Sequence, residues 1–355
     1  MAKDSTCGME FDERNVARDH KEEDMTIECF GSIEFAWHAS NKDWRQAETI
    51  TAGVDVGSAS SQAVVMIDSE IFAYSNIRLG ADSPDSAREA LNAALNRTGM
   101  TGDDIHYVVG TGCGEANISI AKKTVSEVSC HARGVNYSIG SSPRTILVMG
   151  GQDCTAMYCD ERGKVTAFMM NGYRPVNCSE IPCFMCGAAQ GRGMEVMANL
   201  LAVPVEEIAA ISLSVNDELL QERLVRPQEE GGTLPLRYAI SNVCAVLAQS
   251  HATWLLSQGW TKEDILAAYC VAMAHQGVFL LERVGVINDL AITGGVARNL
   301  GVVQRLEKVL GIKATIPEPS PQLTGALGGA LFARAFLERD SGKLHRSLNR
   351  KDEIP

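Results

Sequence analysis

The sequence has no apolar run long enough to cross a membrane. Nowhere do its 355 residues approach the roughly 18 consecutive apolar residues of a spanning helix, and the polar, acidic N-terminus lacks the apolar core of a secretory signal. Basic residues are also few, since 32 Lys and Arg stand against 44 Asp and Glu, a net charge of −12. We therefore expect a cytoplasmic protein that binds neither membranes nor nucleic acid through bulk charge.

The 11 cysteines do not indicate a disulfide framework, because such frameworks are rare in large cytosolic chains. Three of them stand close together ahead of a small-residue turn that leads into a predicted helix, and this arrangement is typical of metal ligands: Cys178, Cys183 and Cys186. Others lie in apolar strand or helix patterns and are predicted to be core residues: Cys113, Cys154, Cys159, Cys244 and Cys270.

The same three-stranded unit is predicted twice. The first unit has strands at residues 50–56, 62–67 and 71–77, and the second has strands at 145–151, 154–160 and 165–171. Such a repeat predicts a duplicated ribonuclease-H-like α/β fold, the architecture of actin, the sugar kinases and the DnaK-type chaperones. The expected parts are a charged extension at 1–49, a first half at 50–143 completed by a helix at about 323–338, a second half at 144–322 and a polar tail at 339–355.

Glycine-rich turns follow the first strand of each unit. Glycine lets the backbone approach phosphate oxygens, and a neighbouring carboxylate can hold hydrated magnesium. A third Gly-Gly turn, between a strand and a helix at 290–311, would let a nucleoside lie across bare backbone. The sequence thus predicts binding of ATP and Mg²⁺ by Asp55, Gly57, Ser58, Gly150, Gly151, Gly294, Gly295 and Asn299. We expect Asp153 to position magnesium or the attacking water and Gln152 to orient that water or the γ-phosphate.

Several segments in combination resemble the BadF/BadG/BcrA/BcrD ATPase family. They are D-V-G-S at 55–58, S-E-V-S-C-H-A-R-G at 126–134, G-G-Q-D at 150–153, the run at 186–198, S-N-V-C-A-V-L-A-Q-S at 241–250 and T-G-G-V-A-R-N at 293–299. The family comprises the ATPase subunits of ATP-dependent benzoyl-CoA reductases and the activators of 2-hydroxyacyl-CoA dehydratases. Residues 76–87 and 193–198 look more similar to the reductase subunits.

The resemblance implies an electron-transfer ATPase in which two identical or homologous protomers share one [4Fe-4S] cluster. Each protomer would contribute two cysteines, here Cys130 and Cys186, with Cys183 as the alternative to Cys186. The implied partners are a homologous ATPase subunit, acyl-CoA reductase or dehydratase subunits, and a ferredoxin-type electron donor. We expect a subunit of a benzoyl-CoA-reductase-like complex, and the alternative is an activator of a 2-hydroxyacyl-CoA dehydratase.

The chain departs from the family pattern in ways that remove charge near the expected active site. Gln62 and Thr155 stand where lysines are usual, Gln249 stands where a glutamate is usual, and residues 172–185 interrupt the run before Cys186. Two interpretations fit: a working ATPase with an altered cluster loop, or a divergent partner subunit that does not hydrolyse ATP. A sugar kinase of the same fold is a third, but it would have no use for Cys130 and the neighbouring cysteines.

Overall fold

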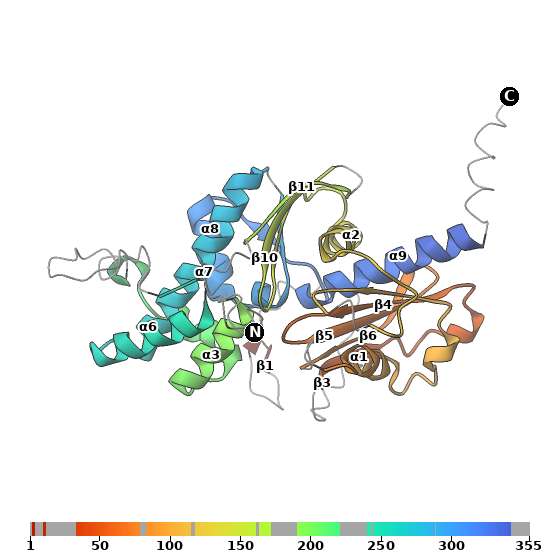
Figure 1. Ribbon diagram of the computed structural model, residues 1–355, viewed down its shortest axis with the longest axis horizontal. Coiled ribbons are helices and arrows are strands. Elements are labelled where there is room, and N and C mark those ends of the chain that lie inside the picture. Colours follow the sequence, from red (N-terminus) through yellow and green to blue (C-terminus); the bar gives the residue numbers. More distant parts are fainter. Residues whose placement is uncertain are drawn as a thin grey trace, which may run out of the picture.

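The first of two sheets that dominate the structure has six strands. The structure, a computed structural model, describes residues 2–3, 10–11, 33–78, 83–114, 118–160, 163–171, 190–220, 240–242, 244–287 and 289–341 (Figure 1). The strand order is β3-β6-β5-β4-β7-β8. The strands are β3 (Ile33–His38), β4 (Ile50–Val56), β5 (Ser61–Ile67), β6 (Glu70–Ile77), β7 (Tyr107–Thr111) and β8 (Lys123–Thr124). A separate short pair joins β1 (Ala2–Lys3) to β2 (Glu10–Phe11).

The second sheet repeats the topology of the first. Its order is β11-β10-β9-β12-β13, formed by β9 (Thr145–Met149), β10 (Cys154–Cys159), β11 (Val165–Met170), β12 (Leu290–Thr293) and β13 (Ala314–Thr315). In both sheets three consecutive antiparallel strands are extended by two parallel ones on the side of the first strand. The predicted duplication and the ribonuclease-H-like fold are therefore confirmed.

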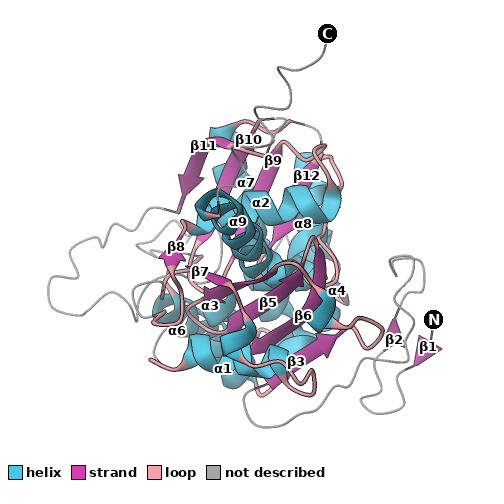
Figure 2. Ribbon diagram, turned by 90° about the vertical axis from the view of Figure 1, so that its right-hand side faces the viewer, coloured by secondary structure: helices cyan, strands magenta, loops and turns pink. Residues whose placement is uncertain are grey.

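Helices cover both faces of each sheet, which explains why every residue of β4 and β5 is buried. On the first sheet, Ala63 and Val65 pack towards α1 (Ser86–Leu95), whereas Val64 and Met66 pack towards α9 (Thr324–Asp340). On the second sheet, α2 (Glu127–Ile139) and α7 (Lys262–Val284) cover opposite faces. Helices α2 and α9 lie side by side between the two sheets (Figure 2).

The remaining helices of the second half are α3 (Gly191–Leu201), α4 (Ile208–Leu213), α6 (Ala245–Ser257) and α8 (Leu300–Leu310). Short 3-10 helices include η4 (Gly102–Asp104), η6 (Val205–Glu207), η7 (Gly295–Arg298) and η8 (Pro321–Leu323). Among the described segments, α7 is the single helix long and apolar enough to span a membrane by itself, yet 83% of its most apolar window is buried inside the protein. Its apolar residues form the core of the second half.

Helix α9 makes unusually close contacts because small residues line it. A methyl group at Gly328 would lie 1.8 Å from the backbone oxygen of Cys130 in α2, and one at Gly53 in β4 would lie 1.9 Å from the backbone oxygen of Ala326. Small residues on both sides are what allow the backbones to approach this closely. The C-terminal helix thus joins the first sheet to α2.

Two sequence interpretations need correction. Strand β3 lies within residues 1–49, which we interpreted as an extension, yet it pairs antiparallel with β6 as the edge of the first sheet. Cys154, Cys159 and Cys270 are buried as predicted and Cys244 is partly buried, but Cys113 is exposed. Gly112 precedes Cys113 with a φ of 94°, so the chain reverses there and the side chain leaves the strand pattern.

Candidate nucleotide-binding site

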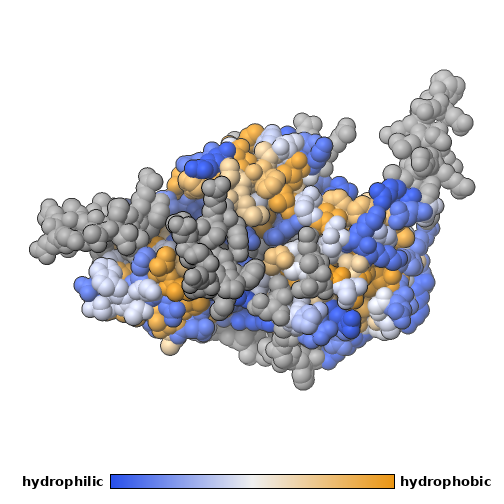
Figure 3. Space-filling model, in the orientation of Figure 1, coloured by the Kyte–Doolittle hydropathy of each residue, from blue (hydrophilic) through white to orange (hydrophobic). Residues whose placement is uncertain are grey.

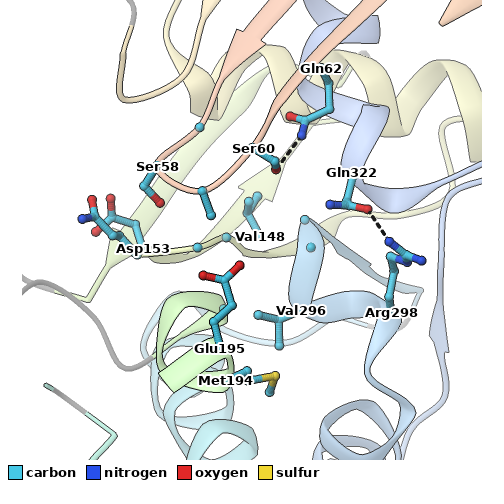
Figure 4. Close-up of a pocket in the computed structure, with 18 of the residues that line it drawn as sticks. Ser58, Ser60, Gln62, Val148, Asp153, Met194, Glu195, Val296, Arg298 and Gln322 are labelled. Atoms are coloured by element: carbon cyan, nitrogen blue, oxygen red, sulfur yellow. Dashed lines mark hydrogen bonds between the residues drawn. The ribbon is translucent and has the colours of Figure 1, made fainter. Parts of the chain in front are cut away.

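A cavity of about 380 Å³ lies between the two halves (Figure 4). All the residues that the sequence predicted to bind nucleotide or act in catalysis line it: Asp55, Gly57, Ser58, Gly150, Gly151, Gln152, Asp153, Gly294, Gly295 and Asn299. They come from three turns that are far apart in the sequence. The fold brings these turns together because the two sheets are related by the internal repeat, and β12 lies next to β9.

The first two turns have the same backbone geometry. In the β4–β5 turn the N–H of Gly57 donates to the carbonyl of Ser60 over 3.0 Å, and in the β9–β10 turn the N–H of Gly150 donates to the carbonyl of Asp153 over 2.9 Å. Asp153 is thus the structural counterpart of Ser60, whereas Asp55 precedes its turn. The two carboxylates therefore approach the cavity from non-equivalent positions.

The two turns also face each other closely. A methyl group at Gly151 would lie 2.5 Å from Oγ of Ser58, so a larger residue there would displace the Ser58 hydroxyl. Helix α3 is fixed to both turns, because the N–H of Gly191 donates to the carbonyl of Gly150 over 3.1 Å and Nη2 of Arg192 donates to the carbonyl of Ser58 over 2.8 Å. A phosphate chain between the turns would lie against backbone groups from both halves.

Asp55 lies at the bottom of this cavity in a crowded position. Burial raises the pKa of its carboxyl group to about 7 and lowers the pKa of His131 to about 4. Nε2 of His131 lies 3.9 Å from Oδ2 of Asp55, and Nδ1 lies 3.4 Å from Oγ1 of Thr293. Because His131 follows Cys130 in α2, this histidine connects the cavity to the helix that carries the predicted cluster ligand.

The cavity offers few protein ligands for magnesium, and Mg²⁺ that is bound to a nucleotide needs only a few. It usually takes one or two carboxylates together with phosphate oxygens and water. Asp55 and Asp153 both line the cavity, and burial raises the pKa of Asp153 as well. The described residues contain no group of three or more His, Cys, Asp or Glu side chains arranged as a metal site. The two carboxylates fit a hydrated Mg²⁺ that arrives with its nucleotide.

The third turn combines a bare backbone with a capped helix. Gly294 has a φ of 89°, and a methyl group there would lie 2.4 Å from the backbone oxygen of Met149. The side chain of Asn299 accepts from the N–H of Val302 over 3.2 Å and caps α8, while its Nδ2 contacts Sδ of Met194 at 3.4 Å. Asn299 therefore shapes the turn, and its amide is already engaged within the protein.

Gln62, which stands where the family usually has a lysine, lies in the wall of the cavity. Nε2 of Gln62 donates to Oγ of Ser60 over 2.8 Å and to Oδ1 of Asn76 over 2.6 Å, and Nδ2 of Asn76 donates to Glu34. An ionised carboxylate can only accept, so Glu34 fixes the orientation of Asn76 and thereby that of Gln62. Gln62 turns both amide hydrogens to the protein, and its carbonyl oxygen is what it can offer to the cavity.

The other departures lie away from the cavity, so only one of the three changes removes charge next to it. Thr155 is buried within β10 and Gln249 is exposed on α6, and neither is among the described residues that line the cavity. Cys130 is fully buried in the first half of α2, with Sγ 3.8 Å from the carbonyl oxygen of Val125. The other two predicted ligands, Cys183 and Cys186, lie outside the described residues.

Sequence reasoning missed several cavity residues because no glycine motif marks them. Glu34 comes from β3, which the charged composition of the N-terminal segment concealed. Nη2 of Arg78 lies 3.1 Å from Oε1 of Glu34 and 2.6 Å from Oε1 of Glu206, so it joins the first half to η6. Arg298 donates to Oε1 of Gln322 over 2.9 Å, and Glu195 projects into the cavity from α3 (Figure 4). The sequence did contain a signal for Glu195, because this residue lies within residues 186–198, one of the segments that resemble the family.

Relatives of this chain include activators of acyl-CoA dehydratases. The chain is 37% identical over 284 residues to the activator of lactoyl-CoA dehydratase from Anaerotignum propionicum, covering 80% of this chain and 96% of that protein. It is 28% identical over 295 residues to one of the subunits of benzoyl-CoA reductase from Thauera aromatica, covering 80% and 93%. These identities favour the activators, contrary to our interpretation of residues 76–87 and 193–198.

A solved structure leads to the same group of proteins. The activator of the 2-hydroxyisocaproyl-CoA dehydratase from Clostridium difficile with bound ADPNP superposes with a TM-score of 0.68 and 32% identity, covering 83% of this chain and 98% of that chain. The profile of the BadF/BadG/BcrA/BcrD ATPase family matches residues 52–333. The chain belongs to the BadF/BadG/BcrA/BcrD ATPase family.

Proposed function

We propose that this protein binds Mg-ATP between its two halves and acts as the ATP-driven activator of a partner enzyme of the 2-hydroxyacyl-CoA dehydratase type. The convergence of three glycine turns on one cavity is the observation that carries the proposal. The identity to the lactoyl-CoA dehydratase activator supports this class of partner over a benzoyl-CoA reductase. We place the protein in the cytoplasm, with a ferredoxin-type protein as its electron donor.

The geometry suggests how events at the nucleotide would reach a partner. Asp55 and Asp153 would hold the hydrated magnesium, and Gln152 would orient the attacking water. Asp55 lies against His131 of α2 and also against α9, because a methyl group at Gly325 would lie 2.0 Å from Oδ2 of Asp55. A change at the phosphates would therefore move α2 and α9, which lie between the sheets.

The iron–sulfur cluster remains part of the proposal through the family resemblance. A [4Fe-4S] cluster would supply a low-potential electron, and two protomers would each contribute two cysteines. The described residues do not fit that arrangement by themselves, since Cys130 is fully buried and a ligand shared between protomers must reach the surface. Cys130 would have to become accessible before a second protomer could share its sulfur.

Replacing Asp153 with alanine is expected to lower ATP hydrolysis by about 100-fold or more, because the carboxylate would no longer place magnesium or water. Phosphate release should be measured with Mg-ATP, with and without the partner enzyme. Asp103→Ala, which removes an exposed carboxylate in η4, is the matched control and should leave the rate unchanged. If the wild-type chain hydrolyses no ATP in either setting, it is a non-hydrolysing partner subunit instead.

Replacing Cys130 with alanine is expected to abolish iron binding in protein purified without oxygen. Iron and acid-labile sulfide should be quantified together with the visible absorption that dithionite bleaches. Cys244→Ala, at the start of α6, should retain the wild-type iron content. A Cys130→Ala protein with full iron content would show that Cys130 is not a ligand, and comparing Cys183→Ala with Cys186→Ala identifies the second one.

A further inference from the structure

The side chain of Gln62 is buried in the cavity wall, yet its carbonyl oxygen has no hydrogen-bond donor among the described residues. Gln62 is 5% exposed and lines the cavity. Its Nε2 donates to Oγ of Ser60 (Figure 4) and to Oδ1 of Asn76, which uses both amide hydrogens. The carbonyl oxygen is thus left as an acceptor at the cavity, and a buried acceptor without a partner loses free energy unless something binds to it.

Gln62 stands beside a carboxylate at the first phosphate turn. In the antiparallel register of β4 and β5, Gln62 lies directly opposite Asp55. Residues that are directly opposite project from the same face of a sheet, with their Cβ atoms about 5 Å apart. The carbonyl oxygen of Gln62 and the carboxylate of Asp55 are therefore neighbouring oxygen donors on the face that meets the cavity.

The lining of the cavity carries little positive charge for a site proposed to bind a polyanion. No lysine is among the described residues that line it, and its two arginines are engaged with other side chains, Arg78 with Glu34 and Glu206 and Arg298 with Gln322. Magnesium would be offset by the two aspartates proposed to hold it, so the phosphates would still lack a counter-charge. Six carboxyl side chains line the same cavity: Glu34, Asp55, Glu127, Asp153, Glu195 and Glu206.

We propose that K⁺ binds between the carbonyl oxygen of Gln62 and the phosphates of the nucleotide, where it supplies the charge that a lysine at this position would supply. This inference rests on the proposed function, because the phosphate oxygens complete the site. Neutral carbonyl oxygens are the ligands that replace the hydration shell of K⁺. Divalent ions such as Mg²⁺ instead bind through carboxylates, phosphates and retained water, so the two cations would not compete for this oxygen.

The test is calorimetric titration of the full chain with Mg-ATP in KCl and in choline chloride at the same ionic strength. Choline carries its charge inside methyl groups and cannot take the place of K⁺. The wild-type protein should bind Mg-ATP at least about tenfold more tightly in KCl, because a cation beside the phosphates offsets their charge. Gln62→Lys should bind in both salts about as tightly as the wild type does in KCl, since its ammonium group occupies the site. Gln62→Met, which has a similar length but no carbonyl oxygen, should bind equally weakly in both salts.

The possible outcomes separate this inference from the proposed function. Gln249→Lys, which adds the same charge at an exposed position of α6 away from the cavity, should keep the full wild-type dependence on K⁺. If the wild-type protein binds Mg-ATP equally well in both salts, the inference is wrong. It is also wrong if Gln62→Lys or Gln62→Met retains the tenfold effect of K⁺, because the ion would then bind elsewhere. Failure of the wild-type protein to bind Mg-ATP in either salt contradicts the proposed function itself.

Discussion

Replacing Asp55 with asparagine should abolish Mg-dependent ATP hydrolysis while raising the melting temperature of the nucleotide-free protein. The substitution preserves the shape of a side chain that fits tightly, since a methyl group at Gly112 would lie 2.4 Å from Oδ1 of Asp55. It removes one of the two carboxylates proposed to hold magnesium, and the expected loss of rate is about 100-fold or more. It also removes a negative charge that the folded protein holds in a buried position.

The gain in stability has a defined pH dependence. The pKa of Asp55 is raised from 3.8 to about 7 by burial, so the unfolded chain ionises at lower pH than the folded protein. The wild-type protein therefore loses stability as the pH rises through this range, and the difference corresponds to at most about 4 kcal/mol above pH 7. The melting temperature of Asp55→Asn should exceed that of wild type at pH 8, and the gap should shrink at pH 5.

Calorimetry and phosphate release on the same preparations check both parts of this expectation. Asp103→Asn, in the exposed η4 segment, should change neither the melting temperature nor the rate. An Asp55→Asn protein that hydrolyses ATP at the wild-type rate would remove Asp55 from the site. A variant less stable than wild type at pH 8 would show that its buried charge is compensated in the folded state.

Replacing Gly328 with alanine should be among the most destabilising single changes in the protein. The added methyl group would lie 1.8 Å from the backbone oxygen of Cys130, and 2.5 Å from its carbonyl carbon, so α2 and α9 would have to separate. Alanine is favoured over glycine within a helix by about 1 kcal/mol, hence any loss of stability must come from this contact. We expect a loss of at least about 3 kcal/mol or failure to fold.

Denaturant unfolding of Gly328→Ala beside Gly102→Ala measures this effect. A methyl group at Gly102 would meet no atom within 4 Å, so this control should retain wild-type stability. If Gly328→Ala is as stable as the control, α2 and α9 can move apart at little cost. Their contact would then not transmit changes from Asp55 to Cys130.

The elements that follow a strict local pattern were predictable from the sequence. The first strand of the first unit, residues 50–56, agrees with β4 at both ends because its apolar run is bounded by turn residues. The repeat of strand, turn and strand then placed Gly57 and Gly150 in equivalent turns. The predicted helix at about residues 323–338 also formed, as α9.

The features that the sequence could not predict depend on contacts between distant segments. Strand β3 is only six residues long and becomes a strand because β6 offers it an open edge. Glu195 faces the cavity only because α3 is fixed on the second phosphate turn. Asn299 fits the expected motif, but its side chain caps α8. A motif therefore identifies the neighbourhood of a residue better than the partner of its side chain.

Strand β3 also affects how the first half can be isolated. The family-matched region begins at residue 52, whereas β3 covers the edge of β6 from outside that region. A fragment that starts at the matched boundary would leave the hydrogen-bonding groups of β6 unpaired, and open strand edges promote association between molecules. The surface in Figure 3 shows apolar patches close to polar ones around the first sheet. The smallest soluble unit of this protein is thus expected to start before residue 33, upstream of the region that matches the family profile.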